Sequence, residues 1–131
     1  MVKALVVEGE ADIRHLLVDQ LKDKGFQVRK GDSTVVALQR VKEERPDVIF
    51  VDIVMPVMNG LLFVSELKED AETFDIPVVL VTAIGLSGVI PKARELGIKH
   101  ILTKPWEMES LDLMIDRALV PRDRQWDIPV V

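Results

Sequence analysis

The stretch Val48-Ile49-Phe50-Val51-Asp52 decides the fold, because four apolar residues lead directly into an acid. A continuous apolar run of strand-forming residues is typical of a parallel strand that is buried on both faces. The following residues include Pro56 and Gly60, neither of which continues a strand. The sequence therefore predicts that the Asp52 carboxylate stands at the carboxyl end of a buried strand.

Three further apolar runs also lead into a polar side chain: Glu8 after residues 4–7, Thr82 after 78–81, and Lys104 after 100–103. In a parallel open sheet the carboxyl ends of the strands share one edge, and ligands bind there. We therefore expect an acid, a hydroxyl and an ammonium to meet Asp52 in one crevice. Such a set suits a phosphoryl group and a divalent cation.

Strand-like runs alternate with amphipathic stretches along the chain. The strands are predicted at 3–7, 27–29, 48–51, 77–81 and 98–102, and the helices at 11–24, 33–44, 60–68, a segment ending at 96, and 107–119. Five such units predict an α/β fold in which helices cover both faces of a parallel sheet. The polar second strand is expected at an edge, and helical spacing predicts that Leu16 and Leu62 belong to the core.

Composition narrows the classes of function. The 131 residues suffice for one domain and include no cysteine, which excludes disulfides and thiolate chemistry. The formal net charge of −5 disfavours direct binding to nucleic acid, which needs clustered Lys and Arg. The sequence shows neither a membrane-length apolar run of about 20 residues nor a secretory leader, so we expect a cytoplasmic protein that does not bind a membrane.

Three separated motifs occur in a fixed order: Asp52 with Met55-Pro56, Met58 and Gly60; Thr82-Ala83; and Lys104-Pro105. On these motifs the chain resembles the receiver domains of two-component response regulators, from Val2 to about Leu119. The resemblance implies a flavodoxin-like three-layer sandwich, with a doubly wound five-stranded parallel sheet in the order 2-1-3-4-5 and five helices. It also implies a receiver domain over residues 1–120, followed by a C-terminal tail over 121–131.

The resemblance further implies that Asp52 accepts a phosphoryl group from a histidine kinase or a histidine phosphotransfer protein. The domain would then signal by contact with a downstream protein target, not as a conventional enzyme, and a homodimer stays open. The residues expected to contact the phosphoryl group are Thr82, Ala83 and Lys104. A carboxylate attacks phosphorus poorly until negative charge is neutralised, so Mg²⁺ is expected. Its implied ligands are Glu8, Asp52, the backbone carbonyl of Val54, and Glu10 as an additional candidate.

The sequence departs from the family's pattern at two places. Receiver domains usually carry two adjacent acids after the first strand, the second a direct metal ligand, but this chain has Glu8-Gly9, which predicts weaker metal binding. The aromatic residue usual on the fifth strand is Ile101 here. A signal from Thr82 would therefore pass through the loop that carries Ile84 and Leu86.

The lifetime of the acyl phosphate is a separate prediction. Val54 and Ile84 stand two residues beyond Asp52 and Thr82, where they flank the entry to the site. Neither has a polar group that could orient an attacking water molecule. The acyl phosphate is therefore expected to be long-lived.

Two other classes of function stay open on the sequence. In a degenerate receiver, Gly9 would have abolished metal binding, and the domain would act as a phosphorylation-independent interaction module. A hydrolase or nucleotide-binding enzyme on the same fold is disfavoured, because the sequence has no Gly-rich loop after the first strand and no Ser/His/Asp set. Magnesium-dependent phosphorylation would separate the degenerate receiver from a working switch.

Overall fold

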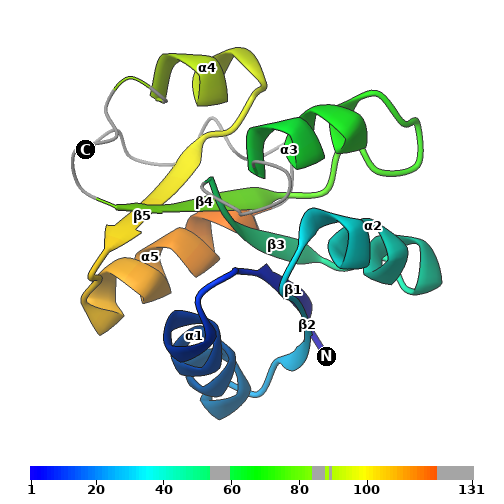
Figure 1. Cartoon of the computed structure of the whole chain (residues 1–131). Helices are drawn as coiled ribbons and strands as arrows, with labels where there is room; N and C mark the ends of the chain where they lie inside the picture. The colour runs from blue at the N-terminus through cyan, green and yellow to red at the C-terminus, as the bar shows by residue number, and fades with distance from the viewer. Residues whose placement is uncertain (54–59, 84–87, 89, 121–131) are drawn as a thin grey trace.

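A computed structural model of the chain describes residues 1–53, 60–83, 88 and 90–120. Strands and helices alternate: β1 (Lys3–Val7), α1 (Ala11–Asp23), β2 (Gln27–Gly31), α2 (Thr34–Glu43), β3 (Val48–Asp52), α3 (Gly60–Lys68), β4 (Val78–Ala83), α4 (Ile90–Glu95), β5 (His100–Lys104) and α5 (Met108–Ala118). The strands form one sheet in the order β2-β1-β3-β4-β5, with parallel pairing throughout (Figure 1). The predicted α/β fold and strand order are confirmed.

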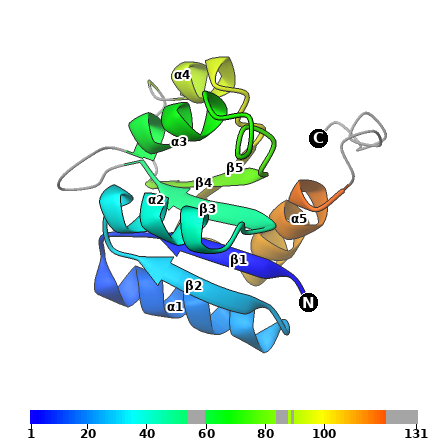
Figure 2. The same cartoon turned by 90° about the vertical axis from the view of Figure 1, so that its right-hand side faces the viewer.

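The sheet lies between two helical layers, with α1 and α5 on one face and α2, α3 and α4 on the other (Figure 2). Each face has its own apolar core, and successive residues of the central strands alternate between the two cores. On β3, for example, Ile49 packs on the α3 side and Phe50 on the α1 side. Every residue of β3 is buried, as its continuous apolar sequence predicted.

Two glycines let the chain reverse after a helix. Gly25 follows α1 with φ of 90°, and Gly97 follows α4 with φ of 80°. Residues with a Cβ atom rarely adopt this left-handed conformation, whereas glycine adopts it without steric cost. The two turns direct the chain into β2, which lies at the sheet edge as predicted, and into β5 at the opposite edge.

The core prediction was wrong at two leucines, because Leu16 on α1 and Leu62 on α3 are exposed. The buried residues of α1 are Leu17, Val18 and Leu21, and those of α3 include Phe63, Val64 and Leu67. Each exposed leucine directly precedes a buried residue and is therefore rotated by about 100° around the helix axis. The stripe that faces the sheet is too narrow to include it.

Candidate functional site

Strand register brings the predicted polar residues to one edge of the sheet. Val7 of β1 pairs with Val51 of β3, so the residues that follow, Glu8 and Asp52, leave neighbouring strands at the same level. On the other side of β3, Asp52 pairs with Val81, and the next residue of β4 is Thr82. One step further along β4, Ala83 pairs with Lys104 of β5. These residues therefore meet around the end of β3.

Lys104 is the centre of a charge cluster at this edge. Its Nζ donates hydrogen bonds to Glu8 Oε1 and, at 3.3 Å, to Asp52 Oδ2, and it lies 3.8 Å from Glu10 Oε1. The side chains of Glu8, Asp52 and Lys104 are only 3%, 7% and 12% exposed, whereas that of Glu10 is 71% exposed. Three carboxylates thus share one ammonium group, and two of these carboxylates are out of contact with bulk water.

The pKa values of Glu8 and Lys104 reflect this excess of carboxylates over ammonium groups. Burial raises the pKa of Glu8 to about 7, the neighbouring Asp52 carboxyl adds to this shift, and Lys104 offsets only part of it. Burial alone would lower the pKa of Lys104, but its contacts with Glu8 and Asp52 outweigh burial and raise that pKa. Lys104 is therefore a cation at neutral pH, while Glu8 is poised between its neutral and ionised forms.

The oxygen atoms of the cluster fit a small hard cation. Glu8, Glu10 and Asp52 each offer a carboxylate oxygen, and these atoms lie within 4.8 Å of one another. Glu8 Oε2 is buried and has no hydrogen-bond partner among the residues that the structure describes. Leaving such an oxygen unpaired is unfavourable, and Mg²⁺ prefers carboxylate oxygens. The predicted ligand Val54 lies outside the described residues.

The other predicted site residues lie on β4 and β5. Thr82 is buried, and its Oγ1 donates a long hydrogen bond of 3.4 Å to the Ala83 carbonyl oxygen, while Ala83 itself is exposed. Ile101 is half-buried and packs against the core on the side of α3 and α4. Ile84 and Leu86, the predicted switch residues of the following loop, lie outside the described residues.

Gly60 sets the distance between α3 and the site. A Cβ atom at this position would lie 2.1 Å from the Asp52 carbonyl oxygen, and the Gly60 amide donates a 2.8 Å hydrogen bond to the Ile53 carbonyl oxygen. Only a residue without a side chain allows this approach. The motif needs Gly60 because α3 begins directly against the backbone of Asp52.

Arg14 is a site residue that the sequence analysis missed. Its Nη1 donates to the carbonyl oxygens of Glu8 at 2.8 Å and Gly9 at 3.4 Å, from the first turns of α1. These bonds hold the loop that carries the acidic residues. Arg14 lies in the helix predicted over residues 11–24, but sequence spacing alone does not reveal that its side chain turns back to the preceding loop.

The fold and the cluster of carboxylates around Lys104 define a flavodoxin-like α/β domain with a polar site at the carboxyl edge of its sheet. The family model of the response regulator receiver domain matches residues 4–116. This chain belongs to the response regulator receiver domain family.

Individual relatives agree with this assignment. The chain is 33% identical over 119 residues to the protein PilH of Pseudomonas aeruginosa, covering 91% of this chain and 98% of PilH. It is 37% identical over 109 residues to the phosphate regulon transcriptional regulatory protein PhoB of Klebsiella pneumoniae, covering 83% of this chain but 48% of PhoB. The chain thus spans about half the length of PhoB. The chemotaxis protein CheY4 of Vibrio cholerae superposes with a TM-score of 0.85 at 28% identity, over 91% of this chain and 99% of CheY4.

These comparisons support a receiver domain of two-component phosphorelay signalling and do not favour the degenerate alternative. Receiver domains interact with histidine kinases or phosphotransfer proteins and with downstream targets, and they generally bind Mg²⁺. Among the described residues, none of the helices combines the length and the apolar character that a bilayer crossing requires.

Proposed function

We propose that Asp52 is the phosphoacceptor of this chain, and that it takes the phosphoryl group from a phosphohistidine of a histidine kinase or a histidine phosphotransfer protein. A carboxylate oxygen of Asp52 would attack phosphorus while the P–N bond to the donor imidazole breaks. The electron pair of that bond leaves with the imidazole nitrogen, which takes up a proton, and an acyl phosphate forms. The observation that supports this role is the buried Asp52 side chain, hydrogen-bonded to Lys104 at the carboxyl edge of the sheet.

Lys104 and Thr82 would bind the phosphoryl group. The Lys104 ammonium is a compact positive charge that binds the Glu8 and Asp52 carboxylates before phosphorylation. After phosphorylation it would donate a hydrogen bond to a phosphoryl oxygen instead. The Thr82 hydroxyl is held only by a long bond, so it can rotate to donate to a phosphoryl oxygen, and the amide of Ala83 is a further donor.

Glu8 and Asp52 would hold Mg²⁺, together with the backbone carbonyl of Val54. Glu8 Oε2 is buried and has no hydrogen-bond partner in the described part of the chain, which supports Glu8 as a ligand. A glutamate at this position reaches one methylene further than an aspartate. When bound, Mg²⁺ supplies the positive charge that reduces repulsion between the carboxylate and the phosphoryl oxygens.

The output of the domain is proposed to start at Thr82. With Ile101 in place of the usual aromatic residue, the movement of Thr82 would be read through the loop that carries Ile84 and Leu86, by contact with a protein target. The proposed receiver domain spans residues 1–120, with a C-terminal tail over 121–131, and works in the cytoplasm, as is typical of the family.

The test is phosphorylation of the full chain by acetyl phosphate or phosphoramidate, with and without Mg²⁺, followed by intact mass measurement. We expect a Mg²⁺-dependent gain of one phosphoryl group in the wild type and in Asp116→Asn, a matched control in an exposed position on α5. Asp52→Asn should show no gain. If the wild type also gains nothing at high Mg²⁺ concentration, the domain serves binding alone and the proposal is wrong.

A further inference from the structure

We propose that Glu10 supplies the carboxylate ligand that this chain lacks at Gly9, so that the metal site is built from Glu8, Glu10 and Asp52. The usual second acid of the family would stand at position 9, where glycine has no side chain to contribute. This inference rests on the proposed magnesium-dependent function, because the cation is the one that phosphorylation of Asp52 requires.

The geometry brings the three carboxylates together without any rearrangement. One oxygen of each of Glu8, Glu10 and Asp52 lies within 4.8 Å of the other two. Of these residues, Glu8 is only 2% exposed and keeps a buried oxygen that has no hydrogen-bond partner in the described part of the chain. The cluster thus places the Glu10 and Asp52 carboxylates near a buried oxygen of Glu8 that lacks a hydrogen-bond partner among the described residues.

Glu10 stands at the N-cap of α1 but does not cap the helix. Its backbone is extended, with φ of −82° and ψ of 118°, and its side chain makes no capping hydrogen bond. Glutamate is also not among the residues preferred at this position. An acid near a helix N-terminus does interact favourably with the helix dipole, which explains a negative charge there. Glu10 Oε1 also lies 3.8 Å from the Lys104 ammonium, and this ion pair directs the side chain toward Glu8 and Asp52.

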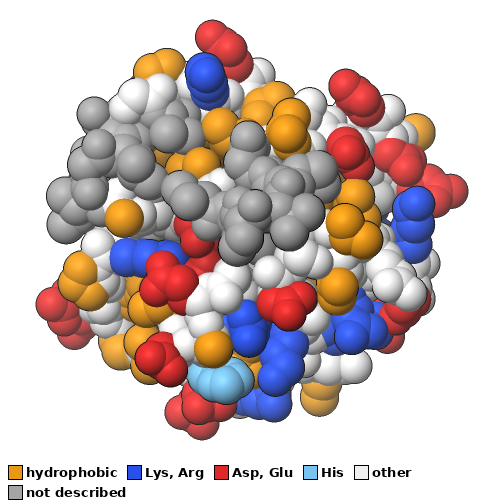
Figure 3. Space-filling view, viewed as in Figure 1, with side chains coloured by type: hydrophobic (Ala, Val, Ile, Leu, Met, Phe, Trp, Pro, Cys, Tyr) orange, Lys and Arg blue, Asp and Glu red, His pale blue; other side chains and the backbone are white. Residues whose placement is uncertain are grey.

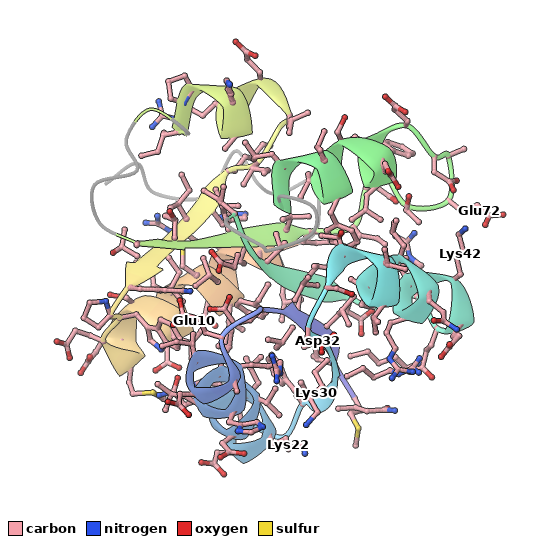
Figure 4. The ribbon with its side chains drawn as sticks, in the orientation of Figure 1. Glu10, Lys22, Lys30, Asp32, Lys42 and Glu72 are labelled. Carbon is pink, nitrogen blue, oxygen red and sulfur yellow. The ribbon has the colours of Figure 1, made fainter. Side chains whose placement is uncertain are left out.

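Arg14 fixes the loop that gives Glu10 this position. Its guanidinium donates to the carbonyl oxygens of Glu8 and Gly9, and its backbone amide donates to the Glu10 carbonyl oxygen at 2.9 Å. Three consecutive carbonyl groups are therefore bound by one residue. With this loop held, the side chains of Glu8 and Glu10 both approach Lys104, and Figure 4 shows Glu10 at the start of α1, close to the carboxyl end of β5.

The exposure of the Glu10 side chain limits how much it can contribute to Mg²⁺ affinity. This side chain is 71% exposed and must lose rotamer freedom on binding a cation, which opposes binding. Glu10 should therefore be a weaker ligand than a shorter acid at position 9. The chain is expected to bind Mg²⁺ less tightly than a Gly9→Asp variant, but more tightly than a chain without Glu10.

The first experiment is titration calorimetry of the full chain with MgCl₂, without any phosphodonor. Glu10→Gln should weaken Mg²⁺ binding by about tenfold or more, since the loss even of a residue that only hydrogen-bonds to a metal ligand costs about 10-fold to 100-fold in affinity. Glu72→Gln is the matched control, because it removes the same charge from an exposed position far from Glu10 (Figure 4). Thermal unfolding without metal should be nearly the same for both variants.

The second experiment is a rescue. Gly9→Asp should tighten Mg²⁺ binding, and in this background Glu10→Gln should weaken binding by less than about threefold, because the ligand position is filled. Equal Mg²⁺ affinities of wild type, Glu10→Gln and Glu72→Gln would overturn the role of Glu10 and leave the proposed function intact. If the wild type binds no Mg²⁺ while Gly9→Asp does, both the role of Glu10 and the proposed cofactor are wrong.

Discussion

The two edges of the sheet differ in how far their charged side chains are buried. At the amino edge, a groove of about 660 Å³ is lined mostly by apolar residues, together with the charged or titratable side chains of Asp47, Lys68, Asp75, Lys99 and His100. Both aspartates and Lys99 are exposed to water. At the carboxyl edge, by contrast, the described residues bury Glu8 and Asp52 around a largely buried Lys104. The exposed charges of this groove therefore remain in contact with water, whereas Glu8 and Asp52 at the carboxyl edge are buried.

The face seen in Figure 3 also carries exposed charges of both signs. Acidic and basic side chains are interspersed over the face seen in Figure 3, and several form exposed ion pairs such as Arg29 with Glu43. Pairs of this kind contribute little to stability, because water screens them. Burying incompletely balanced charge is costly, so a protein that does so at one place usually uses that place for function. The burial of charged side chains therefore indicates the candidate site at the carboxyl edge, whereas the presence of a groove at the amino edge does not.

The largest expected effect is that of Lys104→Met, which removes the ammonium that Glu8 and Asp52 share. Breaking a buried ion pair on one side costs about 3–5 kcal/mol, because charge is left unpaired. The loss in the free energy of unfolding should be greatest near pH 8 and smaller near pH 6, where Glu8 can take up a proton. Urea unfolding measures both values.

Lys42→Met provides the control for this substitution. Lys42 is an exposed cation on α2, so its replacement should change the free energy of unfolding by no more than about 0.5 kcal/mol. If Lys104→Met lowers the free energy of unfolding by as little as Lys42→Met does, the ion pairs at the carboxyl edge contribute no more to stability than exposed ones. The contrast between the two edges would then fail.

Gly60→Ala tests the backbone of the same edge. The added Cβ atom would meet the Asp52 carbonyl oxygen at 2.1 Å, so α3 or the end of β3 must shift. We expect a loss of about 3 kcal/mol in the free energy of unfolding, as is found when a close-packed site is overfilled. Gly88→Ala is the control, because none of the described residues lies within 4 Å of a Cβ atom there. Equal stabilities would show that α3 does not depend on this close approach.

Sequence patterns predicted the parts of this site that follow from strand order. Asp52, Thr82 and Lys104 each end or follow an apolar run, and parallel pairing then brings them to one edge. The position of Arg14 was missed, because its bond to the Glu8 carbonyl oxygen depends on the path of a loop. Leu16 shows a related limit: helical spacing identifies an apolar side but not the width of the stripe that the sheet covers.

The pH dependence of stability should distinguish Glu8 from an ordinary surface acid. In the folded chain the pKa of Glu8 is raised by burial to about 7, whereas the ordinary value is 4.5, so between these values only the folded state holds the proton. The free energy of unfolding therefore falls as the pH rises through about 7. Glu8→Gln cannot titrate, so relative to this variant the wild type should lose about 1 kcal/mol between pH 6 and 8.

Urea unfolding at several pH values measures this difference. Burial lowers the pKa of His100, which by itself makes stability rise with pH in part of the same range. His100 is present in both proteins, so its contribution cancels when the two curves are subtracted. Parallel curves for the wild type and Glu8→Gln would show that Glu8 is ionised throughout, as an exposed acid would be.

The smallest effect is expected at the amino edge, from Asp75→Asn. Asp75 Oδ1 lies 3.0 Å from Arg45 Nη2, but the two side chains are 41% and 50% exposed, so water and salt screen the pair. The free energy of unfolding should change by less than about 1 kcal/mol, with a smaller change at higher ionic strength, and the Mg²⁺-dependent mass gain should be the same as in the wild type. A loss of several kcal/mol, or a reduced mass gain, would show that the amino edge also holds charge under constraint and would remove the distinction between the edges. The same chemical change at Asp52 should abolish the mass gain, because it replaces the proposed phosphoacceptor, a buried carboxylate that shares the Lys104 ammonium with Glu8, by an amide.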